Sequence, residues 1–307
     1  MKNAPIIQHY VPQFLIRNFC FGKKKQINVF EKASGKSFVS NTKNIASERN
    51  FYNYIDKGET KTLEFMLSEY ESKVKPIIDK LLETQSFLSI NKIEHQLLSQ
   101  FIALQLLRTK TQREQLKAIS NYCFDNFEKL GFTSPKDQNY ENELKLVISN
   151  LINKNLEEFS QIIYKKNWFL ITNKSNQSFS ISDNPITMYN ENYNPLIGNI
   201  GIEIEGIQIY LPISPKVTVA IYCESLKEKI SYFKKIPNYN LVGKTLLGAI
   251  EKSSYWDAPE EVITFLNGLQ TCFSERYIFS KTGDFSLYVK QIQDNPSLKQ
   301  GPRSSIL

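Results

Sequence analysis

The chain has 307 residues, of which 41% are hydrophobic and 12% aromatic, and its formal net charge is +7. This length and composition provide enough apolar surface for one large domain with a sizeable core. The sequence contains no apolar run long enough for a transmembrane helix, and its N-terminus lacks the apolar region of a secretory signal peptide. We therefore expect no membrane partner and a cytoplasmic location.

The cysteines and the basic net charge indicate little about function on their own. Cys20, Cys123, Cys223 and Cys272 lie far apart, whereas zinc sites usually include a closely spaced pair. Free thiols in a reducing cytosol are therefore expected. The positive charge is spread along the chain, so it permits an anionic partner such as nucleic acid but signals one only weakly.

A short helix and a β-hairpin are predicted first. Pro12 suits the first position of a helix that ends near Phe19, because its missing N–H has no role there. Two strand-like runs, 26–30 and 36–39, flank a turn that contains Gly35. This pattern predicts an N-terminal hairpin.

Three long helices are predicted next. Apolar residues recur at helical spacing over 59–84, and Pro76 within that run predicts a kink or a break. Asn91 is expected to cap a second helix that continues to about Leu130. A third helix is predicted over 141–165, after a loop.

The period then changes to that of strands. Strands are predicted at 168–172, 178–182, 202–210, 217–222, 277–280 and 285–289. Helices are predicted near 239–252 and 259–274. Because strands and helices are segregated along the chain, an α+β fold is expected, with the hairpin and long helices packed against a mainly antiparallel sheet from the C-terminal half.

This pattern indicates a single domain over 1–290, with a helical part at about 59–165 and a sheet-rich part at about 166–290. Residues 291–307 are expected to form a disordered tail. The sequence has no G-x-G-x-x-G, P-loop or G-x-S-x-G motif, which argues against dinucleotide-dependent dehydrogenases, P-loop NTPases and α/β-hydrolases.

Two polar residues fall on an apolar helix face. Gln105 and Arg108 lie within the stripe formed by Leu98, Phe101 and Leu104. A buried arginine needs a carboxylate partner. It serves either as an ion-pair anchor between helices or, with Gln105, as part of a pocket for an anionic group.

Candidate partners lie on the preceding helix. Glu64 and Glu71 are two helical turns apart and project the same way from the edge of its apolar stripe. Solvated glutamates are common at such positions. Beside a core-facing arginine, they become candidate ion-pair partners or ligands of a divalent cation such as Mg²⁺ or Mn²⁺.

The first helix brings a histidine and an arginine together. His9 precedes it, and Gln13 and Arg17 share one face at i, i+4. A histidine near an arginine suits general acid–base chemistry, because its pKa lies near neutrality. The more common role is a histidine that only caps a helix or bonds to the core. The other histidine, His95, is placed on the polar side of a helix start.

A strand end supplies the last candidates. Asp183 and Asn184 stand directly before Pro185, where the backbone must stay extended. They form either a simple turn or, with Asp183 directed into the same cleft as His9 or Arg108, part of a site.

The segment from His9 to Phe19, which reads HYVPQFLIRNF, resembles the hallmark of the bacterial "domain of unknown function 4238" proteins. Further segments recur there in the same order, among them Gln105 with Arg108, and Ser182 to Pro185. The resemblance covers about residues 8–280. It implies a bacterial or phage-related origin and a cytoplasmic protein, and it implies no activity.

The leading hypothesis is a nuclease-like hydrolase that acts on a phosphodiester or other anionic substrate, of the kind used in phage defence. His9 would be general acid or base, with Asp183 and Glu64 or Glu71 orienting it or holding a metal. Gln13, Arg17, Gln105, Arg108 and Asn184 would bind the substrate. The alternatives are a non-enzymatic module that senses an anionic ligand, nucleic acid or partner protein, and a polar cluster that only stabilises the fold.

Overall fold

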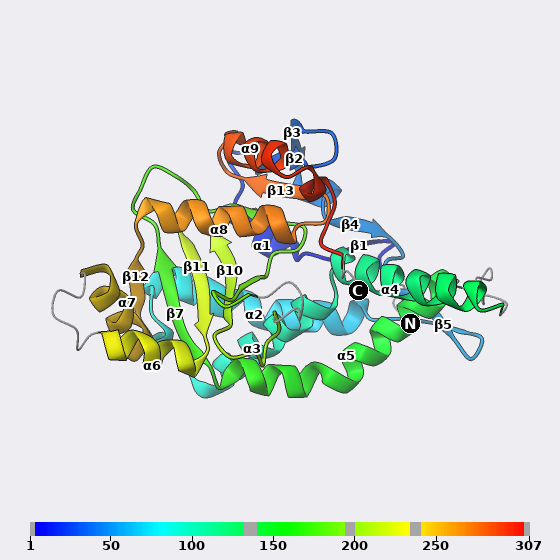
Figure 1. Cartoon of the computed structure of the whole chain (residues 1–307), viewed down its shortest axis with the longest axis horizontal. Coiled ribbons are helices and arrows are strands. Elements are labelled where there is room, and N and C mark those ends of the chain that lie inside the picture. The colour runs from blue at the N-terminus through cyan, green and yellow to red at the C-terminus, as the bar shows by residue number, and fades with distance from the viewer. Residues whose placement is uncertain (1–3, 132–139, 194–199, 234–240, 304–307) are drawn as a thin grey trace.

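The computed structural model describes residues 4–131, 140–193, 200–233 and 241–303, and it has the expected α+β architecture (Figure 1). Its helices are α1 (Gln13–Arg17), α2 (Glu64–Thr84), α3 (Lys92–Leu107), α4 (Lys110–Lys129), α5 (Tyr140–Tyr164), α6 (Glu224–Phe233), α7 (Leu241–Glu251), α8 (Glu260–Phe273) and α9 (Ser286–Asp294). Short 3₁₀ turns occur at Thr42–Asn44, Phe87–Ser89 and Pro296–Lys299.

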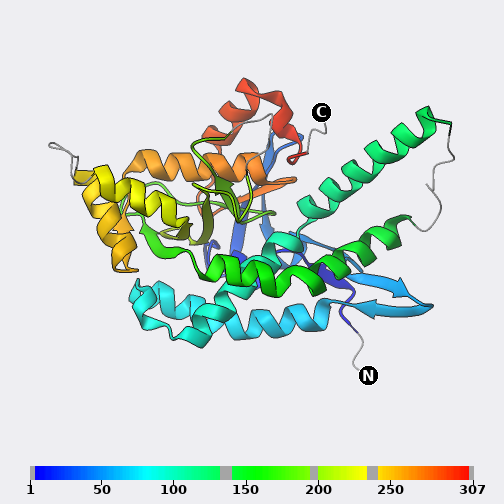
Figure 2. The same ribbon diagram turned by 60° about the horizontal axis from the view of Figure 1, so that its bottom comes forward.

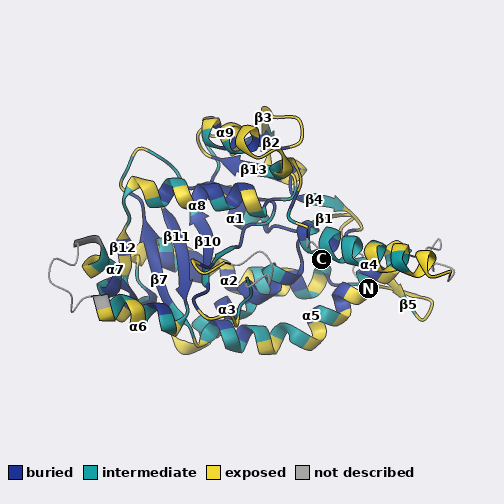
Figure 3. Ribbon diagram, viewed as in Figure 1, coloured by how far each residue is buried: buried dark blue, intermediate teal, exposed yellow. Residues whose placement is uncertain are grey.

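A five-stranded sheet forms the main core. Its strand order is β12 (Tyr255–Asp257), β7 (Asn167–Thr172), β11 (Val217–Tyr222), β10 (Gln208–Ser214), β9 (Thr187–Tyr189). All neighbours are antiparallel except β12 and β7. β11 is buried along its whole length (Figure 3). This fits its sequence, in which Thr218 is the one residue that is neither aliphatic nor aromatic.

A four-stranded sheet joins the two ends of the chain. Its order is β3 (Lys36–Asn41), β2 (Gln26–Glu31), β13 (Tyr277–Ser280), β8 (Ile181–Ser182). The predicted hairpin is therefore confirmed as β2–β3, and the C-terminal strand β13 pairs antiparallel with β2. Two smaller pairs are β1 (Ile7–His9) with β4 (Ser47–Arg49), and β5 (Asn53–Asp56) with β6 (Glu59–Thr62).

The start of α2 differs from the prediction. Residues Glu59–Thr62 form strand β6, because Lys57 and Gly58 both have positive φ and close a tight β5–β6 hairpin. The helix begins at Glu64 and continues through Pro76 to Thr84. Of the predicted kink or break, the break is therefore wrong, and the kink stays a prediction. One proline removes a single backbone donor, and the buried side chains on both sides of it hold the helix together.

The second predicted helix is two helices. α3 ends at Leu107 and α4 begins at Lys110, with Arg108 as the C-cap of α3 and Thr109 as the N-cap of α4. The predicted cap at Asn91 is confirmed, with a capping box to Glu94. Beyond the break, α4 and the beginning of α5 project from the body beside β5 (Figures 1 and 2).

The C-terminal region also departs from the prediction. Residues 285–289 belong to α9 and its N-cap instead of a strand, because Phe285, Tyr288 and Ile292 share one helix face and pack with Phe30. α6, which had not been predicted, follows β11. Residues 178–180 and 202–207 lie outside strands.

The expected disordered tail is packed as far as residue 303. The ammonium of Lys32 is fully buried and donates to the carbonyls of Thr271, Ser274 and Gln300, at 2.7, 2.7 and 3.2 Å. Arg303 forms an ion pair with Glu275. Residues 304–307, like much of the predicted loop 131–139, lie outside the described residues. In the described part of the chain, no helix is long and apolar enough to cross a membrane.

Candidate functional site

The residues predicted from the first three helices do come together. β1 carries His9, and α1 carries Gln13 and Arg17. α2 carries Glu64 and Glu71. The last turn of α3 carries Gln105, and Arg108 is the C-cap of that helix. We call these seven residues the His9–Arg108 cluster. Its members are joined by hydrogen bonds and by electrostatic interactions that cross from one element to another.

Arg108 is the buried anchor of the cluster. Its side chain is fully buried, and its Nη1 donates to Oε1 of Glu71 at 2.9 Å. Its Nε donates to Oε1 of Gln105 at 2.7 Å, while Nη2 is buried and has no hydrogen-bond partner among the residues that the structure describes. The ion-pair reading of Arg108 is therefore present in the structure, and one guanidinium donor remains unused.

Both polar atoms of the Gln105 side chain form hydrogen bonds within this buried region. Its Oε1 accepts from Arg108, and its Nε2 donates to the carbonyl of Tyr10 at 2.8 Å. The hydroxyl of Tyr52 donates to the carbonyls of Arg108 and His9, at 3.3 and 3.5 Å. Because these contacts are buried, Gln105 and Arg108 hold the N-terminal segment against α3 and are poorly placed to contact a substrate.

The α1 residues form a second, more exposed chain. Arg17 is exposed, and its Nη2 donates to Oε1 of Gln13 at 2.7 Å. The Nε2 of Gln13 lies 3.4 Å from Nδ1 of His9. Burial lowers the pKa of His9, which Glu71 and the backbone of Thr42 partly offset. The lowered pKa favours the neutral imidazole at pH 7, and its Nε2 is buried.

Glu64 is the cluster residue with the most perturbed carboxyl. It is half-buried at the first turn of α2, and its side chain has no hydrogen bond or ion pair with any residue that the structure describes. Burial and, to a smaller extent, the charge of Glu71 raise the pKa of Glu64 to about 7, while the charge of Arg108 opposes this shift. Glu64 and Glu71 thus differ in environment: one is unpaired, and the other forms an ion pair with an arginine.

Asp183 and Asn184 serve a different part of the fold. The fully buried carboxylate of Asp183 accepts the backbone N–H groups of Glu275, Arg276 and Tyr277, at 2.8, 2.8 and 2.9 Å. Asn184 donates to the carbonyl of Phe273 at 2.9 Å. None of these bonds reaches the His9–Arg108 cluster. Both side chains shape the connection between α8 and β13, so the structure does not support their predicted roles in a shared cleft.

His95 is not on a polar surface as expected. Its ring lies 4.6 Å from that of Trp168 and 4.7 Å from that of Tyr164, centroid to centroid. Burial lowers the pKa of His95 to about 4. It is a half-buried histidine packed among aromatic rings, and the sequence pattern missed this because Tyr164 and Trp168 come from later elements.

Metal binding would need converging ligands. Across the described ranges, no group of three or more His, Cys, Asp or Glu side chains is arranged to hold a metal ion. In the same residues the four cysteines are free thiols.

The sequence model of one protein family, described as "Protein of unknown function (DUF4238)", matches residues 7–284. The chain belongs to this family. The match covers all members of the His9–Arg108 cluster. No curated protein and no solved structure matches the chain. Family membership therefore places the cluster within the shared domain and leaves its chemistry to be argued from the residues.

Proposed function

We propose that this DUF4238 protein is a hydrolase acting on a phosphodiester or similar anionic substrate, with Glu64 as the group that transfers the proton. The observation that carries the proposal is a half-buried carboxyl, without a partner among the described residues, whose pKa is about 7. General acid–base groups work best when their pKa lies near the operating pH. Such perturbed groups concentrate at functional sites.

The reaction assigned to this site is simple hydrolysis. The oxygen of a water molecule forms a bond to phosphorus while the bond from phosphorus to the leaving oxygen breaks. The Glu64 carboxylate takes a proton from the attacking water and then gives a proton to the leaving oxygen. The group returns to its starting state, and no oxidant or reductant is consumed.

The other members of the His9–Arg108 cluster have supporting roles. Arg17 is exposed and supplies the positive charge that an anionic substrate requires. The Glu71–Arg108 ion pair sets the field around Glu64. His9, predicted as the acid or base, has a buried Nε2 and is better placed to orient Gln13 and Arg17 through hydrogen bonds than to meet a substrate.

The test is a cleavage assay with purified protein. RNA, single- and double-stranded DNA and nucleotides are incubated with and without Mg²⁺ or Mn²⁺. Glu64→Gln should lower the rate at least about a hundredfold, which is the low end for a general acid–base group. Glu69→Gln is the matched control, because Glu69 lies on the same helix but is exposed and paired with Lys73. Equal rates for both variants and wild type would end the proposal.

A non-enzymatic sensor of anionic ligands is the second candidate. It is favoured by the exposed guanidinium of Arg17, which can pair with an anionic group. In that case Glu64→Gln and His9→Asn keep the affinity for a fluorescently labelled oligonucleotide, whereas Arg17→Ala loses it. Arg108→Ala does not discriminate between the two candidates, because it also removes the buried anchor.

A further inference from the structure

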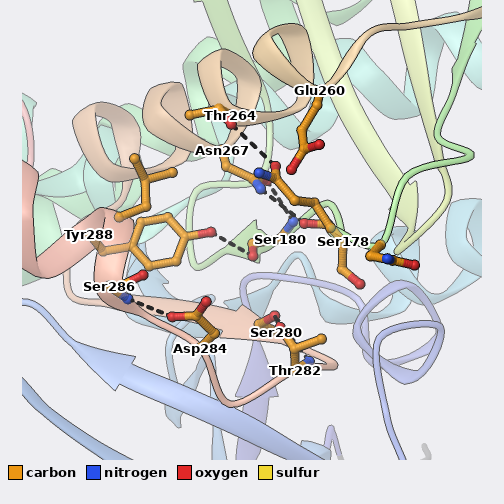
Figure 4. Close-up of a pocket in the computed structure, with 13 residues that line it drawn as sticks. Ser178, Ser180, Glu260, Thr264, Asn267, Ser280, Thr282, Asp284, Ser286 and Tyr288 are labelled. Carbon is orange, nitrogen blue, oxygen red and sulfur yellow. Dashed lines mark hydrogen bonds between the residues drawn. The ribbon is translucent and has the colours of Figure 1, made fainter.

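A polar pocket lies away from the His9–Arg108 cluster and shares no residue with it. It has a volume of about 350 Å³ and lies between the starts of α8 and α9, the segment 176–180 and the turn after β13 (Figure 4). Pockets for small ligands begin at about 300 Å³. This pocket is therefore large enough for a small molecule.

The lining of this pocket is rich in hydroxyl groups. Seven of its thirteen lining residues carry a hydroxyl, three carry an amide, and Leu287 is the one aliphatic member. Hydroxyls and amides both donate and accept hydrogen bonds, so they match a ligand that does the same. A hydroxyl-rich ligand satisfies this requirement.

Two carboxylates in the lining determine which ligand charge the pocket favours. Glu260 comes from α8, and Asp284 stands on the opposite wall (Figure 4). Glu260 has no hydrogen bond or ion pair with any part of the chain that the structure describes, and no lysine, arginine or histidine is among the described lining residues. The pocket therefore disfavours phosphate and carboxylate ligands and favours a cation.

The inner wall is held in place before any ligand enters. Asn267 accepts from the backbone N–H of Ser180 and donates to the carbonyl of Ser178, both at 2.9 Å. The hydroxyl of Tyr288 donates to Oγ of Ser180 at 2.6 Å. These buried bonds fix the segment 178–180 against α8 and α9, which lowers the entropy lost on binding.

We propose that this pocket binds a small hydroxyl-rich molecule that carries an amino group, of the amino-sugar class. The ammonium group lies between Glu260 and Asp284, and the ligand hydroxyls replace water on the serine and threonine side chains. The anionic substrate proposed for the His9–Arg108 cluster does not suit this pocket, so the two proposals stand or fall separately.

Calorimetric titration of the full chain tests the proposal. The probes are glucosamine, galactosamine and mannosamine, with glucose and glucose 6-phosphate for comparison. At least one amino sugar should bind about tenfold more tightly than glucose, as a charged hydrogen bond implies, and glucose 6-phosphate should bind most weakly. No binding of any amino sugar at millimolar concentration, or equal binding of glucose 6-phosphate, overturns the proposal.

Variants locate the binding. The double variant Glu260→Gln with Asp284→Asn removes both negative charges and keeps the shapes of the two side chains. The amide oxygen of the new asparagine still accepts from the Ser286 N–H. It should lose about tenfold in amino-sugar affinity and change little for glucose. Glu261→Gln is the matched control, since Glu261 shares the first turn of α8 but does not line the pocket. If the control loses as much affinity as the double variant, the ligand is not bound between these carboxylates.

Discussion

Replacing Glu64 by glutamine should make the protein more stable at high pH. In the folded chain burial raises the pKa of Glu64 from 4.5 to about 7. The folded state therefore keeps a proton that the unfolded state releases, and stability falls as pH rises from about 4.5 through about 7. Glutamine has the shape of the protonated acid and does not titrate, so the variant escapes this loss.

The size of the effect follows from the same values. The full pKa difference corresponds to about 3 kcal/mol. Glu64 keeps some solvent contact and sits in the first turn of α2, where the helix dipole favours its carboxylate. We therefore expect Glu64→Gln to be more stable than wild type by about 2 kcal/mol at pH 8, and nearly equal to it below pH 4.5.

Urea unfolding at a series of pH values measures this difference. Glu69→Gln, with its exposed carboxylate on the same helix, should show no such gain at pH 8. If the difference between Glu64→Gln and wild type does not change with pH, the carboxyl is not perturbed. The role assigned to it in proton transfer would then lose its physical basis.

Three further substitutions test the structural assignments. Asp183→Ala leaves three buried N–H groups without an acceptor and should lower the free energy of unfolding by about 3 kcal/mol, measured in urea. Lys32→Met removes the bond to Gln300, so limited proteolysis should release the C-terminal segment faster than in wild type. His95→Phe should reduce the loss of melting temperature on acidification. Burial holds the pKa of His95 at about 4, so the wild type loses stability as pH falls from 6.5 toward 4.

The fold class was predictable because long periodic segments dominate the chain. The spacing over 141–165 predicted α5 to within a residue at each end, and the β-branched residues at 217–222 predicted β11. The break between α3 and α4 was missed because the apolar stripe runs up to it. A signal was nevertheless present: Thr109 followed three residues later by Gln112 matches the pattern of a helix start.

The helix α9 shows where local pattern fails. Residues 285–289 alternate like a strand, yet Phe285, Tyr288 and Ile292 are spaced for one helix face. A short window contains only part of that spacing. The packing partner Phe30 comes from the other end of the chain, so tertiary contact decides between the two patterns.

In the candidate site, too, some contacts could be predicted from the sequence and others could not. Glu71, Gln105 and Arg108 were predictable because polar residues on or beside the apolar stripes of adjacent helices must meet one another. The partners of Asp183 were not, since its carboxylate is satisfied by backbone groups more than ninety residues later. A backbone N–H carries no signal in the sequence.

The pairing of β2 with β13 sets an order of events during synthesis. The hairpin β2–β3 leaves the ribosome early, but its partner strand is among the last segments made. At typical rates of translation the inner edge of β2 therefore waits on the order of tens of seconds before it is covered. Over that interval the nascent chain presents an unpaired strand edge, which makes chaperone binding or premature association of this edge the main hazard in producing the protein.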